Sequence, residues 1–228
     1  MASSIASAQP QLRDLDVNFR NGLEEFKTQL ESLEVQIAPD QVPHKGDSNH
    51  QHVLAAFERS QNICRDFETE HSDDLDYVRT AQSNFRSETD PWLTLSWIGN
   101  RARSKPSGFA GDYEMLVKLY DEATPARGLG GYIDLCILDL PLARAVRARL
   151  AAARNFLLQE IASRDGGVRI LDIASGPCRE YLNWPNLGEQ PLEIVAMDND
   201  PVALDYVGNH VVPGLQAPTS LRPQRYNA

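Results

Sequence analysis

Two short apolar segments near the end of the chain constrain its fold more than any other feature. Residues 168–173 read Val-Arg-Ile-Leu-Asp-Ile, and residues 192–197 read Leu-Glu-Ile-Val-Ala-Met. Short apolar runs that are bounded by turn residues predict buried strands. A long helical pattern precedes the first run and a shorter one follows the second, over residues 202–207, which is typical of parallel strands. We therefore expect an α/β unit that contains a parallel sheet.

Small and acidic residues follow each of the two expected strands. Asp172 lies at the end of the first strand, and the small residues 174–176 form a turn whose backbone a ligand can approach closely. Asp198 and Asn199 end the second strand. We expect a helix to open after the turn, so that the whole segment predicts a nucleoside-binding βαβ unit. The alternative is an ordinary connection in which Asp172 merely caps the following helix.

The glycine content of the turn argues against a dinucleotide. Gly176 is the single glycine of the turn, and Pro177 and Cys178 follow it. A dinucleotide site needs three glycines so that a helix N-terminus can reach the pyrophosphate. A nucleotide-dependent oxidoreductase is therefore a disfavoured alternative.

The segment Asp172-Ile173-Ala174-Ser175-Gly176-Pro177-Cys178 resembles the first motif of the Rossmann-like (class I) S-adenosylmethionine-dependent methyltransferases, and residues 195–201 resemble their second motif. The resemblance implies S-adenosyl-L-methionine as the cofactor and a doubly wound sheet. It implies that Asp198, with Asn199 beside it, holds the ribose hydroxyls. It also implies that the backbone from Ala174 through Ser175 to Gly176 packs against the amino-acid part, with Asp172 near the ammonium group. The chain departs from the motif because Ala174 and Cys178 replace its first and third glycines.

A second loop, residues 105–114, reads Lys-Pro-Ser-Gly-Phe-Ala-Gly-Asp-Tyr-Glu, and its Asp112 is placed to cap a helix over residues 112–121. Together with the first motif, this loop resembles a bacterial methyltransferase subgroup that makes 3-hydroxy fatty acid methyl esters, a cell-density signal in quorum sensing. The resemblance implies that Asp112 and Tyr113 shape the acceptor side of the active site. The alternative is a structural turn that docks a helical cap on the sheet.

The first third of the chain carries an apolar stripe at helical spacing. From Phe19 onward its steps alternate between four and three residues, which predicts a helix over residues 12–37 that packs along its whole length. One interpretation is a helix that forms a homodimer. The other is one arm of a helical bundle within the chain.

Further helices are expected over residues 49–70, 73–86, 132–138 and 141–163. Asp90 and Pro91 predict the start of another helix, as its N-cap and its first residue, with residues 92–100 either in the core or over the active site. The helix over residues 141–163 carries a row of four arginines, which either contacts an anionic head group or faces solvent.

These elements divide the chain into a disordered tail (residues 1–10), a helical N-terminal domain (11–140) and a partial Rossmann-like domain that binds S-adenosyl-L-methionine (141–228). Residues 168–228 leave room for two strands and at most the start of a third from residue 222. We therefore expect a fragment of a longer protein, a sheet completed by a partner, or a function that needs no complete sheet. We also expect free sheet edges, one poorly covered face, weak cofactor binding and little transferase activity from this chain alone.

The composition limits the kinds of binding partner that we expect for this chain. The formal net charge of −10 argues against a nucleic acid as partner, and a small-molecule or lipid-like acceptor fits better. No apolar run approaches the roughly 20 residues that span a bilayer. The three cysteines are widely spaced and odd in number, which predicts reduced thiols in a cytoplasmic protein, and the lack of a Cys-x-x-Cys pair argues against a metal site.

The sequence thus predicts a methyltransferase, or the N-terminal part of one, that acts on a carboxylate or hydroxyl of a small molecule or fatty acid. The alternative from another class is a non-catalytic regulatory or dimerisation module in which the methyltransferase fold is vestigial.

Overall fold

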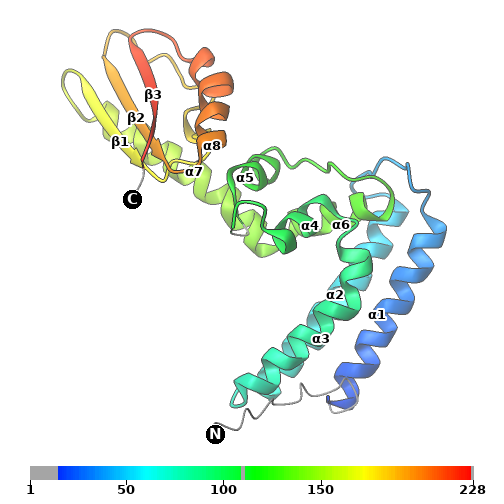
Figure 1. The fold of residues 1–228 in the computed structure, drawn as a ribbon. Helices are drawn as coiled ribbons and strands as arrows, with labels where there is room; N and C mark the ends of the chain where they lie inside the picture. Colours follow the sequence, from blue (N-terminus) through cyan, green and yellow to red (C-terminus); the bar gives the residue numbers. More distant parts are fainter. Residues whose placement is uncertain (1–14, 109–110, 227–228) are drawn as a thin grey trace, which may run out of the picture. The chain divides into compact units, whose positions relative to one another are not determined.

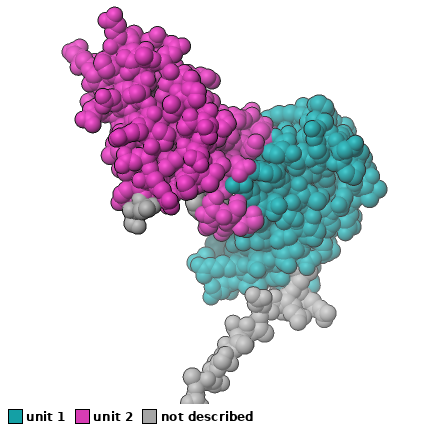
Figure 2. All heavy atoms as spheres, turned by 45° about the horizontal axis from the view of Figure 1, so that its top comes forward, with its two compact units in different colours: residues 1–103, 124–137 teal, residues 104–123, 138–228 magenta. Residues whose placement is uncertain are grey.

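The computed structural model describes residues 15–108 and 111–226 of the chain (Figure 1). The expected disordered tail, residues 1–10, lies outside these residues. The chain forms two compact units: unit 1 contains residues 1–103 and 124–137, and unit 2 contains residues 104–123 and 138–228 (Figure 2). The chain therefore passes from one unit to the other three times. Residues 104–123, which the sequence assigns to the helical domain, belong to the unit that contains the sheet.

Unit 1 is helical. Its three long helices α1, α2 and α3 pack together. The shorter helices α4 and α6 belong to the same unit except for their last one or two residues, which are assigned to unit 2. The bounds are α1 Val17–Gln36, α2 Ser48–Glu70, α3 Leu75–Leu93, α4 Trp97–Ser104 and α6 Gly128–Asp139. Aspartates cap the three long helices, and the Asp16 carboxylate accepts the backbone N–H groups of Asn18 and Phe19 at the start of α1.

The apolar stripe of α1 is buried inside unit 1. Its side chains pack against α2 and α3 in two clusters of the same unit, and they include Phe19, Phe26, Leu30 and Leu33. This confirms the interpretation of α1 as one arm of a bundle within the chain. A homodimer through the same stripe would require the bundle to open.

The expectation that Asp90 and Pro91 begin a new helix is wrong. Helix α3 continues through Pro91 to Leu93, and the chain then turns before α4 begins. Trp92 explains the difference, because its ring is buried and its indole N–H donates to the Glu34 carboxylate of α1 at 2.9 Å. Proline in the last turn of a helix removes a single hydrogen bond, and the burial of a tryptophan side chain outweighs that loss.

Unit 2 combines helices with a parallel sheet, so the chain has an α/β fold as expected. Its helices are α5 Tyr113–Tyr120, α7 Pro141–Ala162 and α8 Pro201–Tyr206, and its strands are β1 Val168–Ile173, β2 Leu192–Asp198 and β3 Thr219–Arg225. The strands follow one another in the order β1-β2-β3, and both neighbouring pairs are parallel (Figure 1). Among the described helices, none combines the length and apolar composition that crossing a membrane requires.

The third strand is longer than the sequence suggested. β3 begins at Thr219 rather than at residue 222, and it pairs with β2 along its whole length. Pro223 is tolerated there because β3 lies at an edge of the sheet, where one side of the strand needs no hydrogen-bond donor.

One face of the sheet is covered and the other is open, as expected. Ile194 and Leu221 face a core that includes Ile161 of α7. On the opposite face, Leu171 and Ile173 of β1 are 60% and 68% exposed. In register beside them on β2 are partly exposed apolar side chains. Among the described strands, none pairs with the free edge of β1.

The expectation of a helix directly after Gly176 is wrong. The connection from β1 to β2 contains a single 3₁₀ turn, Arg179–Tyr181, and is otherwise loop. Ala174, Gly176 and Cys178 all have positive φ angles, and residues in that conformation cannot propagate a right-handed helix. Arg154 of α7 supports the loop by donating to the backbone carbonyls of Leu182 at 2.6 Å and Asn183 at 2.7 Å.

Candidate functional site

The turn that follows β1 has an unusual backbone. Ala174, Gly176 and Cys178 have φ angles of +57°, +51° and +48°, so every second residue adopts the left-handed conformation. This conformation suits glycine, and it costs other residues roughly 1–2 kcal/mol each. The turn therefore keeps a glycine-type backbone at all three positions, although two of them carry a side chain.

Asp198 holds this turn against the end of β2. Its Oδ2 accepts the backbone N–H of Gly176 at 2.7 Å, and its Oδ1 accepts that of Asp200 at 2.9 Å. The backbone N–H of Ser175 donates to the carbonyl of Met197 at 3.1 Å. The Asp198 carboxylate is half-buried and Asn199 beside it is exposed. A carboxylate has about four lone-pair sites, so Asp198 retains capacity to accept hydroxyl donors from a ligand.

Two acidic residues lie close together at the end of β1. Asp172 and Glu180 share a side-chain hydrogen bond, and burial together with this contact raises the pKa of Glu180 to about 8. Two carboxyl groups in hydrogen-bond contact cannot both ionise at low cost, so the pair holds one proton near neutral pH. The pair then carries about one negative charge, which suits a cationic group.

Among the described residues, one set of side chains has the spacing of a metal site. The ligand atoms of Asp172, Cys178 and Glu180 lie within 4.8 Å of one another. Burial raises the pKa of the Cys178 thiol well above its ordinary range, so the thiol stays protonated. Metals bind the thiolate rather than the thiol, so a metal ion here would have to displace the thiol proton and the proton that the two carboxyl groups share. A cationic organic group could be held with both protons in place.

Asp112 and Tyr113 both lie at the start of α5. Asp112 is 1% exposed, and its two carboxylate oxygens accept the backbone N–H of Met115 at 2.9 Å and the hydroxyl of Ser107 at 3.1 Å. These contacts confirm Asp112 as the N-cap of α5. The ring of Tyr113 is half-buried and lies 5.9 Å from the ring of Tyr206 in α8. Phe109 and Ala110 of the same loop lie outside the described residues.

Arg179 ties α5 and α8 to the turn after β1. It forms an ion pair with Asp121, which follows α5, and it donates to the hydroxyl of Tyr206 at 3.0 Å. The side chain of Arg179 is only 12% exposed. Unit 2 thereby brings the predicted residues Asp172 and Asp198, the turn between them and the start of α5 into one network.

Sequence reasoning missed the roles of Glu180, Arg179 and Asp121 in this network, and it assigned Arg154 a different role. Glu180 lies in a loop without periodicity, so no pattern signals that it meets Asp172. Arg179 and Asp121 are 58 positions apart and also lack a signal. Arg154 was recognised only as a member of an arginine row, for which solvent or an anion was expected. It binds backbone carbonyls, and Arg147 of the same row pairs with Glu122 at 2.9 Å.

Comparison of the chain with models of protein families, with curated proteins and with solved structures found no match. The function that follows is therefore inferred from the residues and their geometry.

Proposed function

We propose that unit 2 binds S-adenosyl-L-methionine at the carboxyl ends of β1 and β2, as part of a cytoplasmic methyltransferase. The observation that carries the proposal is the turn after β1. Its three alternate residues adopt the conformation that glycine favours, at the three positions where the first methyltransferase motif has glycine. Sequence resemblance and backbone geometry thus agree at the two positions, Ala174 and Cys178, where the residues themselves depart from the motif.

The charges of the site support this cofactor. In the proposed complex, the remaining lone pairs of Asp198 accept the ribose hydroxyls, with Asn199 exposed beside them. Asp172 precedes the turn and Glu180 follows it in the sequence, and the single negative charge of this pair would attract the ammonium group of the amino-acid part. The exposed residue Ala174 and its neighbours Ser175 and Gly176 leave the backbone accessible between these two ends.

The methyl acceptor in this proposal is a carboxylate or hydroxyl of a small molecule or fatty acid. S-adenosyl-L-methionine held by Asp198, Asp172 and the turn would supply a methyl group on a positively charged sulfur. An acceptor oxygen would form the new O–CH3 bond as the S–CH3 bond breaks and S-adenosylhomocysteine leaves. A carboxylate acceptor is already ionised at neutral pH, so the chain needs only to orient it. Asp112 then acts by fixing the start of α5, and Tyr113 is the residue of that helix that we assign to the acceptor side.

A calorimetric titration with S-adenosylhomocysteine tests the proposal. We expect binding by the wild-type chain, and we expect Asp198→Ala to weaken it about tenfold or more, because hydrogen bonds to a charged group contribute about 1.5–3 kcal/mol. Asp198→Asn keeps one oxygen acceptor and should have a smaller effect. Asp205→Asn, on the exposed side of α8, is the matched control.

The possible results separate the candidate functions. Folded wild-type protein that binds no S-adenosylhomocysteine would contradict the proposal. Tight binding of NADH would favour the oxidoreductase instead.

The open face of the sheet favours the second candidate, a regulatory or assembly module with a vestigial methyltransferase fold. Leu171 and Ile173 expose an apolar surface that another polypeptide would cover. Sedimentation analysis of the wild-type chain beside Leu171→Ser addresses this candidate. Association that the substitution abolishes, in a protein that binds no S-adenosylhomocysteine, would establish it.

A further inference from the structure

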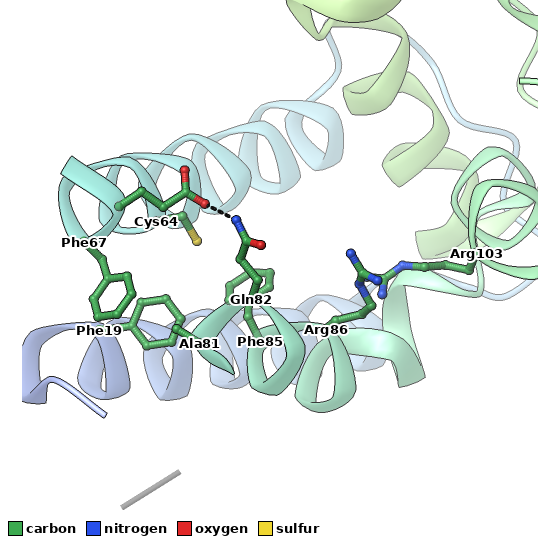
Figure 3. A pocket seen from close by; sticks show the side chains of 9 residues that line it. Phe19, Cys64, Phe67, Ala81, Gln82, Phe85, Arg86 and Arg103 are labelled. Atoms are coloured by element: carbon green, nitrogen blue, oxygen red, sulfur yellow. Dashed lines mark hydrogen bonds between the residues drawn. The ribbon is translucent and has the colours of Figure 1, made fainter. Parts of the chain in front are cut away.

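Unit 1 contains a hollow that the proposed cofactor site does not use. It lies among α1, α2, α3 and the end of α4, and its volume is about 350 Å³ (Figure 3). That volume falls within the range of sites that hold small organic molecules, which is roughly 300–1,000 Å³. All residues that line it belong to unit 1.

One end of the hollow is aromatic. Phe19 of α1, Phe67 of α2 and Phe85 of α3 gather there, with the ring centroids of Phe19 and Phe67 4.6 Å apart and those of Phe19 and Phe85 6.3 Å apart (Figure 3). Cys64 contributes its sulfur to the same wall, and burial raises the pKa of this thiol to about 11, so it is uncharged at neutral pH. This end therefore offers an apolar wall to a ligand.

The other end carries two guanidinium groups. Arg86 of α3 and Arg103 of α4 extend toward one another there (Figure 3). Arg103 pairs with Asp90 at 3.0 Å, whereas no carboxylate within residues 15–108 and 111–226 forms an ion pair with Arg86. Burial lowers the pKa of Arg103, and the charge of Arg86 lowers it further. Two guanidinium groups with one carboxylate leave a net positive charge at this end of the hollow.

Among the described residues that line the hollow, Glu68 is the one acidic residue. Its carboxylate accepts a hydrogen bond from the amide of Gln82 at 2.8 Å, so Glu68 is held by a neighbour on α3. An excess of positive charge at the arginine end is notable because the whole chain has a net charge of −10. A folded protein tolerates two adjacent like charges more easily when a bound anion lies between them.

We propose that this hollow binds a small amphipathic monocarboxylate. Its carboxylate bonds to the guanidinium groups of Arg86 and Arg103, and its apolar body, about the size of two fused rings, lies against Phe19, Phe67 and Phe85. Arginine suits this role because its planar donors match the two oxygens of a carboxylate. Contact with the aromatic wall removes apolar surface of the ligand from water, which makes binding more favourable. The proposal is independent of the cofactor site in unit 2.

Three naphthalene derivatives of similar shape but different charge test whether the hollow prefers an anionic ligand. Calorimetry compares 2-naphthoate with the neutral 2-naphthalenemethanol and the cationic 2-naphthylmethylamine on the full chain. We expect the carboxylate to bind best and the amine least. Absence of 2-naphthoate binding at millimolar concentration, or equal binding of the amine, would overturn the proposal.

Substitution of Arg86 locates the carboxylate. Arg86→Gln should weaken 2-naphthoate binding about fivefold, since it removes an exposed charged donor, while Arg86→Lys should retain part of the affinity. Arg79→Gln is the matched control, because Arg79 lies on the same helix, is exposed and does not line the hollow. An affinity that is the same in wild type and Arg86→Gln would refute the role of Arg86.

Cys64 gives a readout of position that does not depend on a substitution. Cys64 is partly exposed, whereas Cys136 and Cys178 are buried, so a maleimide should modify Cys64 first. Saturating 2-naphthoate should slow this modification several-fold, as measured by mass spectrometry of the labelled peptide, and 2-naphthylmethylamine should not. Unchanged labelling of Cys64 under saturating 2-naphthoate would place the ligand elsewhere and overturn the proposal.

Discussion

The carboxylate of Asp198 accepts the backbone N–H of Gly176 at 2.7 Å, and this bond joins the tip of β2 to the turn after β1. The two residues are 22 positions apart, yet they meet because parallel neighbouring strands end at the same edge of the sheet. The geometry of the turn therefore depends on β2 as well as on its own residues.

The first prediction concerns the left-handed backbone at Ala174. Because Ala174 has a φ of +57° and is exposed, Ala174→Gly relieves strain without removing packed side-chain atoms. The relief of about 1–2 kcal/mol exceeds the entropy cost of glycine, so we expect a net gain of about 0.5 kcal/mol. Ala152→Gly, in the exposed middle of α7, should instead lower stability by about 1 kcal/mol. Urea unfolding of the two variants measures both effects. Loss of stability in both variants would contradict the presence of backbone strain at Ala174.

The second prediction concerns the proton shared by Asp172 and Glu180. The pKa of Glu180 rises from an ordinary value of 4.5 to about 8 in the folded chain, so the folded state binds this proton more tightly than the unfolded state. The free energy of unfolding that this group contributes is present below about pH 4.5 and is lost as the pH rises to 8. Glu180→Gln should remove this pH-dependent loss of the free energy of unfolding. We expect the loss to be about 2 kcal/mol, because the pKa shift belongs to the Asp172–Glu180 pair and not to Glu180 alone.

Denaturant unfolding of wild type and Glu180→Gln at pH values from 5 to 9 checks this prediction. Glu189→Gln, an exposed substitution in the same loop, should leave the pH dependence of wild type in place. Parallel pH profiles for wild type and Glu180→Gln would show that Glu180 titrates normally.

The third prediction concerns the ion pair between Arg179 and Asp121. Asp121→Ala leaves the Arg179 guanidinium, with a side chain only 12% exposed, without its carboxylate, which should cost about 2 kcal/mol of stability. Asp76→Ala, which breaks the fully solvated pair with Arg79, should cost less than about 0.5 kcal/mol. Equal effects of the two substitutions in thermal unfolding would mean that the Arg179 pair has no structural role.

The fourth prediction concerns where the chain can be divided. A fragment of residues 141–228 loses Asp121 and Glu122, the carboxylates that pair with Arg179 and Arg147. A fragment of residues 104–228 keeps both carboxylates, together with α5. We therefore expect the longer fragment to be the more stable of the two and to protect β2 amides better from hydrogen exchange. Equal protection of β2 in the two fragments would support a boundary at residue 141 instead.

Much of the fold was predictable because local patterns agree with the tertiary environment. β1 and the start of β2 match their expected residues, since each is an apolar run between turn residues. The cap at Asp112 and the start of α7 at Pro141 were also predicted correctly. The prediction at Pro91 failed because the buried ring of Trp92 outweighs a local helix-start signal.

The site was predictable in part, for a related physical reason. Asp172 and Asp198 stand at strand ends, and the topology of a parallel sheet brings such ends together. Glu180 lies in an irregular loop, and Asp121 follows a helix that is distant from the site in the sequence. Their roles therefore depend on the path of the chain in space. The absence of a helix after Gly176 was also not predictable from the sequence, because the φ angles of Ala174 and Cys178 cannot be read from their identities.

The open face of the sheet has a consequence for the behaviour of the protein in solution. Leu171 and Ile173 lie on an edge strand, and an edge strand with apolar side chains attracts other copies of itself. The net charge of −10 opposes such encounters through repulsion, which acts over about 10 Å at 0.1 M salt and over about 3 Å at 1 M. We therefore expect the concentration at which this protein remains dispersed to fall as the ionic strength rises.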